Sequence, residues 1–311
     1  MHRIDGPGAT VDNRFTDGDP VGGVQATMVT DDWANDVQEE LMSILAAAAI
    51  TPVKGTQNQV LQAIRKIGVG VVGALRNGRM SVTTASATAT FTADELVVKS
   101  ALGGSAWLIP SFSKSINLAT TGAGGMDTGT APVSGFVALY AIFNPSTGVS
   151  ALLGVNATSA AAPSVYGGVN MPVGYTASAL ISVWPTNGSS LFAVGLQVDR
   201  LIEISPVIVL TSTTLQAAFT PLSIAGAVPL NAKSVTGVAI LGSTVGATIS
   251  MTIASSSTSN LGQNNIGIGP STTTIQGNYS IALLVPQTFY YTWGNSAGSP
   301  SCTMYVASYT F

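Results

Sequence analysis

The chain has 311 residues, of which 46% are hydrophobic and only 8% charged, and its formal net charge is -3. Globular chains are usually about a quarter charged, so the surface must be polar but largely neutral. This balance gives no basic footprint for nucleic acid and no polybasic patch for a membrane, and no apolar run approaches the roughly 18 residues that span a bilayer.

The ionisable residues are unevenly distributed along the chain. Nine of the fourteen acidic residues lie before position 41, and the sole histidine is His2. Beyond Ser100 only six charged residues remain, namely Lys114, Asp127, Asp199, Arg200, Glu203 and Lys233. General acid–base catalysis, His-based metal sites and Ser–His–Asp triads all need titratable groups, of which this long region has almost none. We therefore expect no enzymatic activity, no cofactor and no metal.

Two further features concern disulfide bonding and secretion. The only cysteine is Cys302, so no intrachain disulfide is expected and stability must come from packing, within or between chains. The first residues, MHRIDGPG, contain no apolar segment of the kind found in secretory signals.

Residues 1–29 are rich in Gly, Pro, Asp and Thr and show no apolar periodicity, which predicts an extended arm. Asp12, Asp17 and Asp19 lie close together in this arm. Their spacing does not fit an EF-hand, and Asp–Gly–Asp is an ordinary turn composition. We favour turns over a calcium loop.

A first helix is predicted to begin after Thr30, which can serve as its N-cap, with Asp31 and Asp32 in the first turn where the helix dipole favours negative charge. Pro52 should end it at or before Thr51. Apolar residues then recur at the spacing of a coiled-coil seam: Ala34, Val37, Leu41, Ile44 and Ala48.

A second helix is indicated by the stretch TQNQ at 56–59, which has the form of a capping box. Val60, Ile64 and Ile67 continue the seam spacing. Two alternatives stay open: the helices pack on each other within one chain, or they form a bundle shared by several chains. The following GVGVVG at 68–73 matches a dinucleotide fingerprint, but we reject that interpretation because a helix, not a strand, precedes it.

From Ser81 onward the sequence alternates with period 2 and is punctuated by turns, which predicts β-structure. Residues 136–143 (FVALYAIF) form a continuous apolar run, which indicates a strand buried on both faces. The turn NPSTG at 144–148 leads into a returning strand at 149–155, and 175–184 and 191–198 are predicted to form a second hairpin around the turn at 185–189.

The last hundred residues repeat this pattern. Ile249, Met251 and Ile253 alternate with polar residues, as expected for one buried strand face. A later strand places three aromatic residues, Phe289, Tyr291 and Trp293, on one face, and the last strand is predicted to do the same with Tyr305, Tyr309 and Phe311. Short strands with Gly-rich turns are typical of β-sandwiches. We predict a mainly β chain with an arm and helical segment at 1–80 and β-sandwich domains at 81–205 and 206–311.

Several stretches of the N-terminal region occur in an order that resembles tailed-bacteriophage tail fibres and prophage tail proteins. They are MHRIDGPG, FTDGDP, TDDWANDVQEEL, Ile50–Pro52 and NQVLQAI at 58–64. In the middle, VALYAIFNPSTG, MPVGY and NGSSLFAVGLQVDR resemble a β-sandwich module of fibre shafts. The last hundred residues resemble fibre tips only in their general pattern of short strands and Gly-rich turns. The resemblance as a whole covers about two thirds of the chain.

The resemblance implies a homotrimeric fibre in the virion, made in the cytoplasm of a bacterial host. Its N-terminus would dock to the tail baseplate, and its C-terminus would bind a bacterial surface receptor such as a glycan, a lipopolysaccharide or a pilus. It implies baseplate docking by Trp33, Val37, Gln38 and Leu41, for which ordinary helix packing is the alternative. The chain lacks the His-x-His repeats of one common type of fibre tip.

Candidate receptor contacts are polar or aromatic residues near the predicted tip loops at 255–265 and 294–301. Tyr290 alternates with the buried-face aromatics, and Asn260 and Asn295 offer amide groups. Aromatic rings with polar edges suit glycan binding. The alternative for each aromatic residue is burial in the core or in a trimer interface.

Other functions remain to be weighed against a receptor-binding fibre. A tailspike that degrades polysaccharide would need paired carboxylates, and only Asp127, Asp199 and Glu203 lie beyond Glu95. A purely structural baseplate protein would share the N-terminal features without binding the host. A cellular adhesin is disfavoured by the absence of a visible signal sequence.

Overall fold

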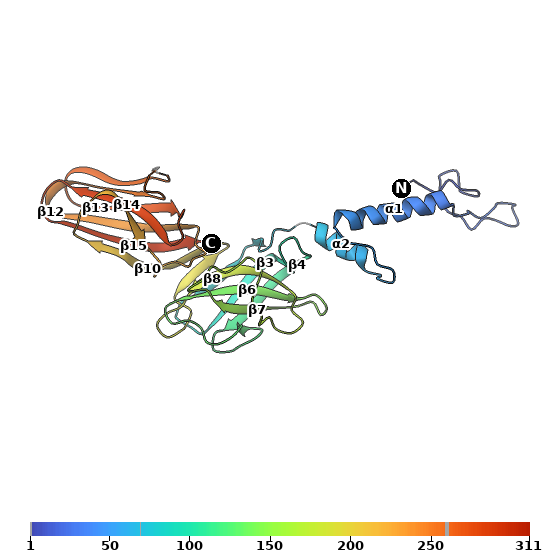
Figure 1. The fold of residues 1–311 in the computed structure, drawn as a ribbon, viewed down its shortest axis with the longest axis horizontal. Coiled ribbons are helices and arrows are strands. Elements are labelled where there is room, and N and C mark those ends of the chain that lie inside the picture. The colour runs from blue at the N-terminus through green and yellow to red at the C-terminus, as the bar shows by residue number, and fades with distance from the viewer. Residues whose placement is uncertain (1, 69, 259–260) are drawn as a thin grey trace. The chain divides into compact units, whose positions relative to one another are not determined.

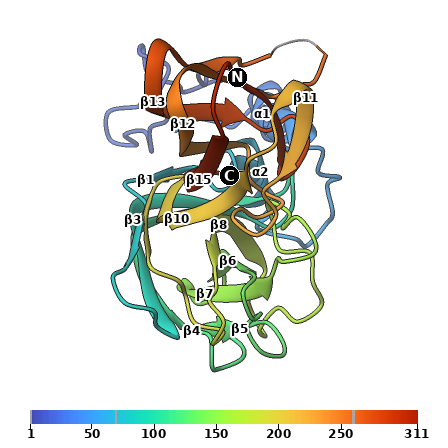
Figure 2. The same ribbon diagram turned by 90° about the vertical axis from the view of Figure 1, so that its left-hand side faces the viewer.

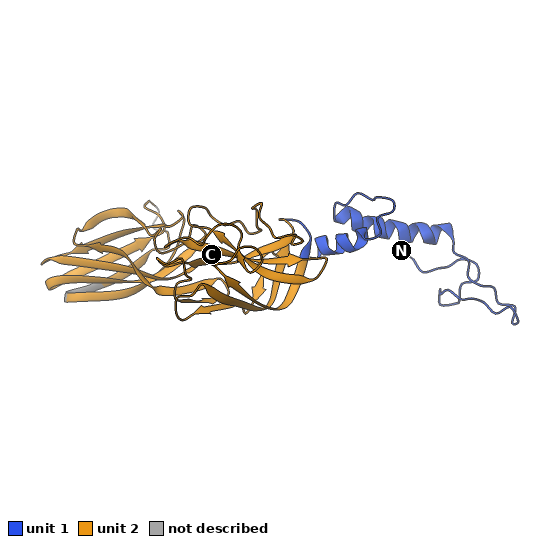
Figure 3. Cartoon of the chain, turned by 90° about the horizontal axis from the view of Figure 1, so that it is seen from below, with its two compact units in different colours: residues 1–69, 103–106 blue, residues 70–102, 107–311 orange. Residues whose placement is uncertain are grey.

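A computed structural model describes residues 2–68, 70–258 and 261–311, with the backbone alone for 268–272. The chain is mainly β, as predicted: in the described residues, two helices are followed by strands joined into one hydrogen-bonded network (Figure 1). It divides into two compact units, one of residues 1–69 with 103–106 and one of residues 70–102 with 107–311 (Figure 3). The sequence-based boundaries at residues 80 and 205 stay predictions. In the described residues, no helix is long and apolar enough to cross a bilayer.

The first helix, α1 (Asp31–Ala47), begins where the sequence predicts, because the Thr30 hydroxyl accepts the Trp33 N–H at 3.4 Å. It ends earlier than Pro52 requires. Ala49 adopts a left-handed backbone with φ 50°, and the Ile50 N–H donates to the Leu45 carbonyl at 2.9 Å. This geometry is a Schellman cap, which ends a helix from within.

The second helix, α2 (Gln59–Ile67), starts without the predicted capping box, so that prediction is wrong. The Gln59 side chain turns away from Thr56. Its Oε1 accepts the Val53 N–H at 3.0 Å and its Nε2 donates to the Thr51 carbonyl at 2.9 Å. Gln59 therefore ties the interhelical loop to the start of α2, because these loop groups lack helical partners.

The two helices pack on each other within one chain through Leu45, Ala48 and Ala63, all of them buried. Four partly buried side chains surround this small cluster: Met42, Ile44, Ile50 and Val60. The contact is short, because α2 has only nine residues.

The first part of the β-rich unit contains nine strands in chain order: β1 (Leu75–Arg76), β2 (Arg79–Val82), β3 (Thr88–Lys99), β4 (Ala106–Asn117), β5 (Gly125–Met126), β6 (Phe136–Asn144), β7 (Val149–Asn156), β8 (Ala177–Pro185) and β9 (Gly195–Val198). The prediction that β6 is buried on both faces is confirmed, since 136–142 are all buried. One face packs into the main core and the other, with Tyr140, packs under the segment at 157–175. β6 lies between β7 and β8 (Figure 2).

The two hairpins predicted in this part have different outcomes. The hairpin of β6 and β7 is confirmed, and Asn144 holds its turn by accepting the Ser146 N–H at 3.0 Å. The second hairpin is wrong: β8 pairs with β6 and β3, whereas β9 pairs with β2 and β10. The chain between β8 and β9 makes isolated bridges, from Phe192 to Thr186 and to Ser86, but no ladder between the two strands.

The second part contains β10 (Leu201–Ser212), β11 (Gln216–Ser223), β12 (Ser234–Ala254), β13 (Asn264–Ala282), β14 (Thr288–Asn295) and β15 (Pro300–Thr310). β12 keeps β13 on one edge along its length. On its other edge it pairs with β15 through residues 234–243 and then with β14 through 249–254. A strand that changes partner in this way can form the corner between two packed layers. β10 connects the parts, since it pairs with both β9 and β15.

The buried faces of this part largely follow the predicted alternation. Phe289, Tyr291 and Trp293 are buried together, as are 249, 251 and 253 of β12. The last strand differs: Tyr309 is buried, whereas Tyr305 is half-exposed. The reason is a bulge, because β12 pairs with residue 308 and then with 306, skipping 307, and one extra residue reverses the alternation.

Candidate attachment and receptor sites

The N-terminal arm doubles back on itself. The Met28 N–H donates to the Pro7 carbonyl and the Thr27 N–H to the Thr16 carbonyl, each at 2.9 Å. Asp19 and Val24 exchange backbone hydrogen bonds at 2.8 Å across a tight turn. The Asp19 carboxylate accepts the Val21 N–H at 3.0 Å, which fits the predicted turn rather than a calcium loop. Among the described residues, no group of His, Cys, Asp and Glu can hold a metal ion.

Trp33 is the point where the arm meets α1. Its ring lies edge-on to Phe15, with ring centroids 5.1 Å apart and an interplanar angle of 81°. Ile4 is only 2% exposed, and a cavity of about 320 Å³ opens beside these three side chains. Trp33 is half-buried, so the chain itself does not cover this residue completely.

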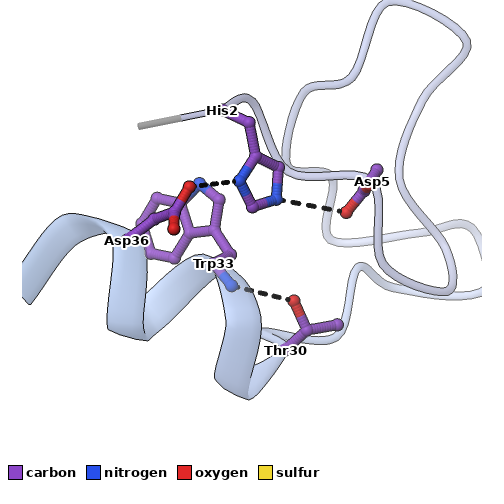
Figure 4. A network of polar contacts seen from close by, with 5 residues as sticks. All are labelled: His2, Asp5, Thr30, Trp33 and Asp36. Carbon is purple, nitrogen blue, oxygen red and sulfur yellow. Dashed lines mark hydrogen bonds and ion pairs between the residues drawn. The ribbon is translucent and has the colours of Figure 1, made fainter.

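His2 fastens the beginning of the arm to the same helix (Figure 4). Its Nδ1 lies 2.6 Å from Asp36 Oδ2, and its Nε2 lies 3.5 Å from Asp5 Oδ1. The hydrogen bond to Asp36 is the main cause that raises the pKa of His2, and it lowers the pKa of Asp36. The predicted arm is therefore attached to α1 by an ionic contact as well as by Phe15.

The four residues implied in baseplate docking lie on α1 but not in one environment. Trp33, Val37 and Leu41 follow at four-residue spacing and so share one face of the helix. Val37 is half-buried, and Leu41 is 44% exposed. Gln38 is exposed and lines, together with Leu41, a groove of about 420 Å³ between α1 and the loop before α2.

The eight predicted seam residues divide into two groups. Ile44, Ala48 and Val60 take part in the contact between α1 and α2. The remaining five are Ala34, Val37, Leu41, Ile64 and Ile67, of which Ile64 is 56% and Ile67 40% exposed. Intrachain packing therefore uses only part of the seam and leaves large apolar side chains uncovered. Leu45, which the spacing missed, is the buried centre of the intrachain contact.

The predicted receptor residues lie in different surroundings. Tyr290 lies in β14 between buried Phe289 and Tyr291 and is itself half-exposed, so it faces away from the core. Asn295 instead stabilises the local fold, because its Nδ2 donates to the Ala297 carbonyl at 2.6 Å and holds the turn before β15. Asn260 lies outside the described residues.

Two of the three carboxylates beyond Glu95 already hold hydrogen bonds within the chain. Asp127 Oδ2 accepts the Tyr166 hydroxyl at 3.0 Å, and Asp199 Oδ1 accepts the Gly78 N–H at 2.8 Å. Asp199 thereby fixes the tight turn between β9 and β10, where its own backbone has φ 51°. Glu203 follows on β10 and is exposed.

The sequence analysis missed two residues that hold the β-rich unit together. The Arg200 guanidinium donates to the carbonyls of Leu180 at 2.9 Å and Gly73 at 2.5 Å. The Tyr309 hydroxyl donates to the Val183 carbonyl at 2.6 Å. These contacts join residues more than a hundred positions apart in some cases, so local patterns carry no signal for them.

No protein-family model matches the chain. One stretch of 73 residues is 40% identical to "Uncharacterized protein StfP" of Escherichia coli (strain K12), covering 22% of this chain and 35% of that protein. The chain thus spans about a third of the length of this relative.

Proposed function

We propose that this chain is a receptor-binding tail fibre of a bacteriophage or prophage, a homotrimer without enzymatic activity. The observation that carries the proposal is the organisation of the chain. A charged N-terminal unit with an incompletely covered apolar seam is followed by a β-rich unit poor in ionisable groups. The phage-like order of the N-terminal stretches supports the same conclusion.

The N-terminal unit would serve attachment. The half-buried ring of Trp33 and the exposed side chains of Gln38 and Leu41 offer a contact surface for a baseplate protein. The ordered arm supports this role, because contacts that are organised before binding lose less entropy when a partner docks.

Trimer formation would cover the rest of the seam. Leu41, Ile64 and Ile67 keep 40–56% of their surface exposed in one chain. Burying that remainder contributes roughly 1 kcal/mol per side chain, whereas each association step costs at least about 4 kcal/mol. The helices alone would hold a trimer weakly, so we propose that the β-rich unit also contributes to the trimer interface.

The β-rich unit would form the shaft and the receptor-binding tip, both as β-sandwiches. The change of partner along β12 supports a two-layer tip. Tyr290 is the best-placed of the candidate receptor residues, because its ring faces away from the core and its hydroxyl is a suitable glycan contact. Three weak sites on one trimer would act together on a bacterial surface.

The assembly is tested by light scattering on the purified chain. We expect a mass three times the chain mass of 31.4 kDa. Leu41→Asp places a charge on the seam and should shift the protein toward smaller species, whereas Ala46→Asp adds the same charge at an exposed position of α1 outside the seam and should not. A soluble monomer of the unaltered chain would contradict the proposed fibre.

The receptor role is tested by adding purified chain to host cells before the phage. Occupied receptors should reduce phage adsorption, and Tyr290→Ala should weaken the competition. A trimer that neither binds cells nor blocks adsorption would instead support a structural baseplate role. Release of reducing sugar from host polysaccharide, lost in Asp199→Asn or Glu203→Gln, would establish a tailspike.

A further inference from the structure

A cavity of about 370 Å³ lies in the β-rich unit. Its wall is formed by the turn between β9 and β10, the segment before β8, the residues before β12 and the last residue of the chain. The side chains used in the argument below are Ser164, Arg200, Asn231, Lys233 and Phe311. None of them belongs to the candidate attachment or receptor residues.

Two cations line this cavity without a carboxylate partner. In the described residues, no ion pair involves Arg200 or Lys233. The neighbouring Asp199 is directed to the Gly78 N–H and does not pair with the guanidinium. Burial lowers the pKa of Arg200, and the charge of Asp199 offsets this only in part. Half-buried charge without a counter-ion is unfavourable, so an anion that enters the cavity would relieve this penalty.

The donors of Arg200 are only partly used. A guanidinium carries five N–H groups in a planar fork, and two bonds, to Leu180 and Gly73, are formed within the chain. The ring of Phe311 lies 4.9 Å from the guanidinium carbon and orients the plane. The remaining donors of a fixed guanidinium fork suit a carboxylate or phosphate group.

The two other polar side chains of the wall, Asn231 and Ser164, do not pair with the cations in the described residues. Asn231 forms two hydrogen bonds of 2.8 Å with the backbone of Ala162, one through each side-chain polar atom. These two hydrogen bonds hold the cavity wall in place and use both polar atoms of the Asn231 side-chain amide. Ser164 is exposed, and Lys233 is an exposed residue that lines the same cavity.

We propose that the cavity beside Arg200 and Lys233 binds an oxyanion, the carboxylate or phosphate of a saccharide ligand. Arg200 supplies the oriented hydrogen bonds, Lys233 supplies a second positive charge in the wall, and Phe311 adds an apolar side chain to the lining. This site is separate from the residues proposed for the tip, and its ability to bind small anions does not depend on the fibre role.

The proposal is tested by calorimetric titration of the full chain at low ionic strength with three probes: D-glucuronate, inorganic phosphate and neutral D-glucose. We expect glucuronate or phosphate to bind and glucose not to bind, with affinity falling as salt is added. Stronger binding of glucuronate identifies a sugar carboxylate, and stronger binding of phosphate identifies a phosphorylated sugar. Absence of binding by both anions overturns the proposal.

Three variants place the binding in this cavity. Ser164→Glu supplies an internal carboxylate beside the cations and should weaken anion binding at least about tenfold. Lys233→Gln removes an exposed charge and should weaken it about threefold. Lys66→Gln removes the same charge from α2 and should have no effect. Arg200 is left unaltered because it also holds Gly73 and Leu180.

The outcomes separate a real site from general charge effects. If Ser164→Glu fails to fold by circular dichroism, Lys233→Gln against Lys66→Gln still decides the question. The proposal is overturned if both lysine variants weaken anion binding equally. It is also overturned if anion binding is unchanged in Lys233→Gln and in a folded Ser164→Glu. Host adsorption is measured separately, so failure of the anion site and failure of the fibre role give different results.

Discussion

Tyr309→Phe tests the contact that joins β15 to β8. The Tyr309 side chain is completely buried, and its hydroxyl donates to the Val183 carbonyl at 2.6 Å. The substitution removes one oxygen and no methyl group, so the lost apolar burial is negligible. What remains is a buried carbonyl that has lost a donor, which costs about 1–2 kcal/mol. A unit of this size melts about 2–4 °C lower per kcal/mol, so we expect a shift of roughly 5 °C.

The assay is thermal unfolding followed by circular dichroism at one fixed protein concentration, because oligomer formation makes the midpoint concentration-dependent. Tyr305→Phe is the matched control. It lies in the same strand, is half-exposed, and its hydroxyl forms no hydrogen bond within the described residues. We expect it to stay within about 0.5 kcal/mol of the unaltered chain. Equal midpoints for both variants would refute the reasoning that the Tyr309 hydroxyl stabilises the unit.

Three further predictions concern single groups. The raised pKa of His2 means that its contact with Asp36 of α1 is fully formed below the ordinary histidine pKa of about 6.5 and is lost as pH rises through the raised value. Trp33 fluorescence should therefore change above that pH in the native chain and not in His2→Ala. Thr30→Ala should destabilise the start of α1 by about 1 kcal/mol, which would be measured as faster hydrogen exchange of the amides in its first turn. Thr30→Ser is the control, because it retains the capping hydroxyl. Equal exchange rates in the two variants would contradict the capping role of Thr30. Cys302 is 1% exposed and burial raises its pKa to about 12, so a thiol reagent should react only with unfolded chain, and rapid labelling of the native protein would disprove this burial.

The elements that could be predicted from sequence are those specified by neighbours in the chain. The start of α1 followed from one capping residue and two acidic residues in its first turn. The burial of β6 followed from an uninterrupted apolar run, and the β6–β7 turn followed from Asn144 and its successors. In each case the signal and the structure lie within about ten residues.

Three sequence-based predictions were wrong, each for a specific structural reason. The second predicted hairpin was wrong because β8 and β9 each find better-placed partners elsewhere in the unit, which local alternation cannot reveal. The last strand kept its predicted position but not its predicted face, because a bulge at 307 moves Tyr305 outward. The capping box failed because Gln59 binds the preceding loop instead of the Thr56 backbone. The first failure thus arises from strand pairing between distant parts of the chain, the second from a bulge and the third from a hydrogen bond to a nearby loop.

The predicted apolar seam of the helices was likewise identified only in part from the sequence. The seam spacing identified Leu41, Ile64 and Ile67, which remain exposed, but not Leu45, which lies at the centre of the intrachain contact. A heptad pattern does not say which of two adjacent apolar residues faces its own chain and which faces another, because both lie near one stripe of the helix.

The scarcity of charge beyond Ser100 becomes more informative once the partners of the carboxylates are known. A glycosidase needs two carboxyl groups that face one groove across the scissile bond and can exchange protons or attack there. Asp127 is occupied by the Tyr166 hydroxyl and Asp199 by the Gly78 N–H, whereas Glu203 is exposed on β10. Freeing a second carboxylate would break a contact that holds a turn or a loop. This competition between folding and catalysis is the physical reason to propose a protein that binds saccharide rather than one that cleaves it.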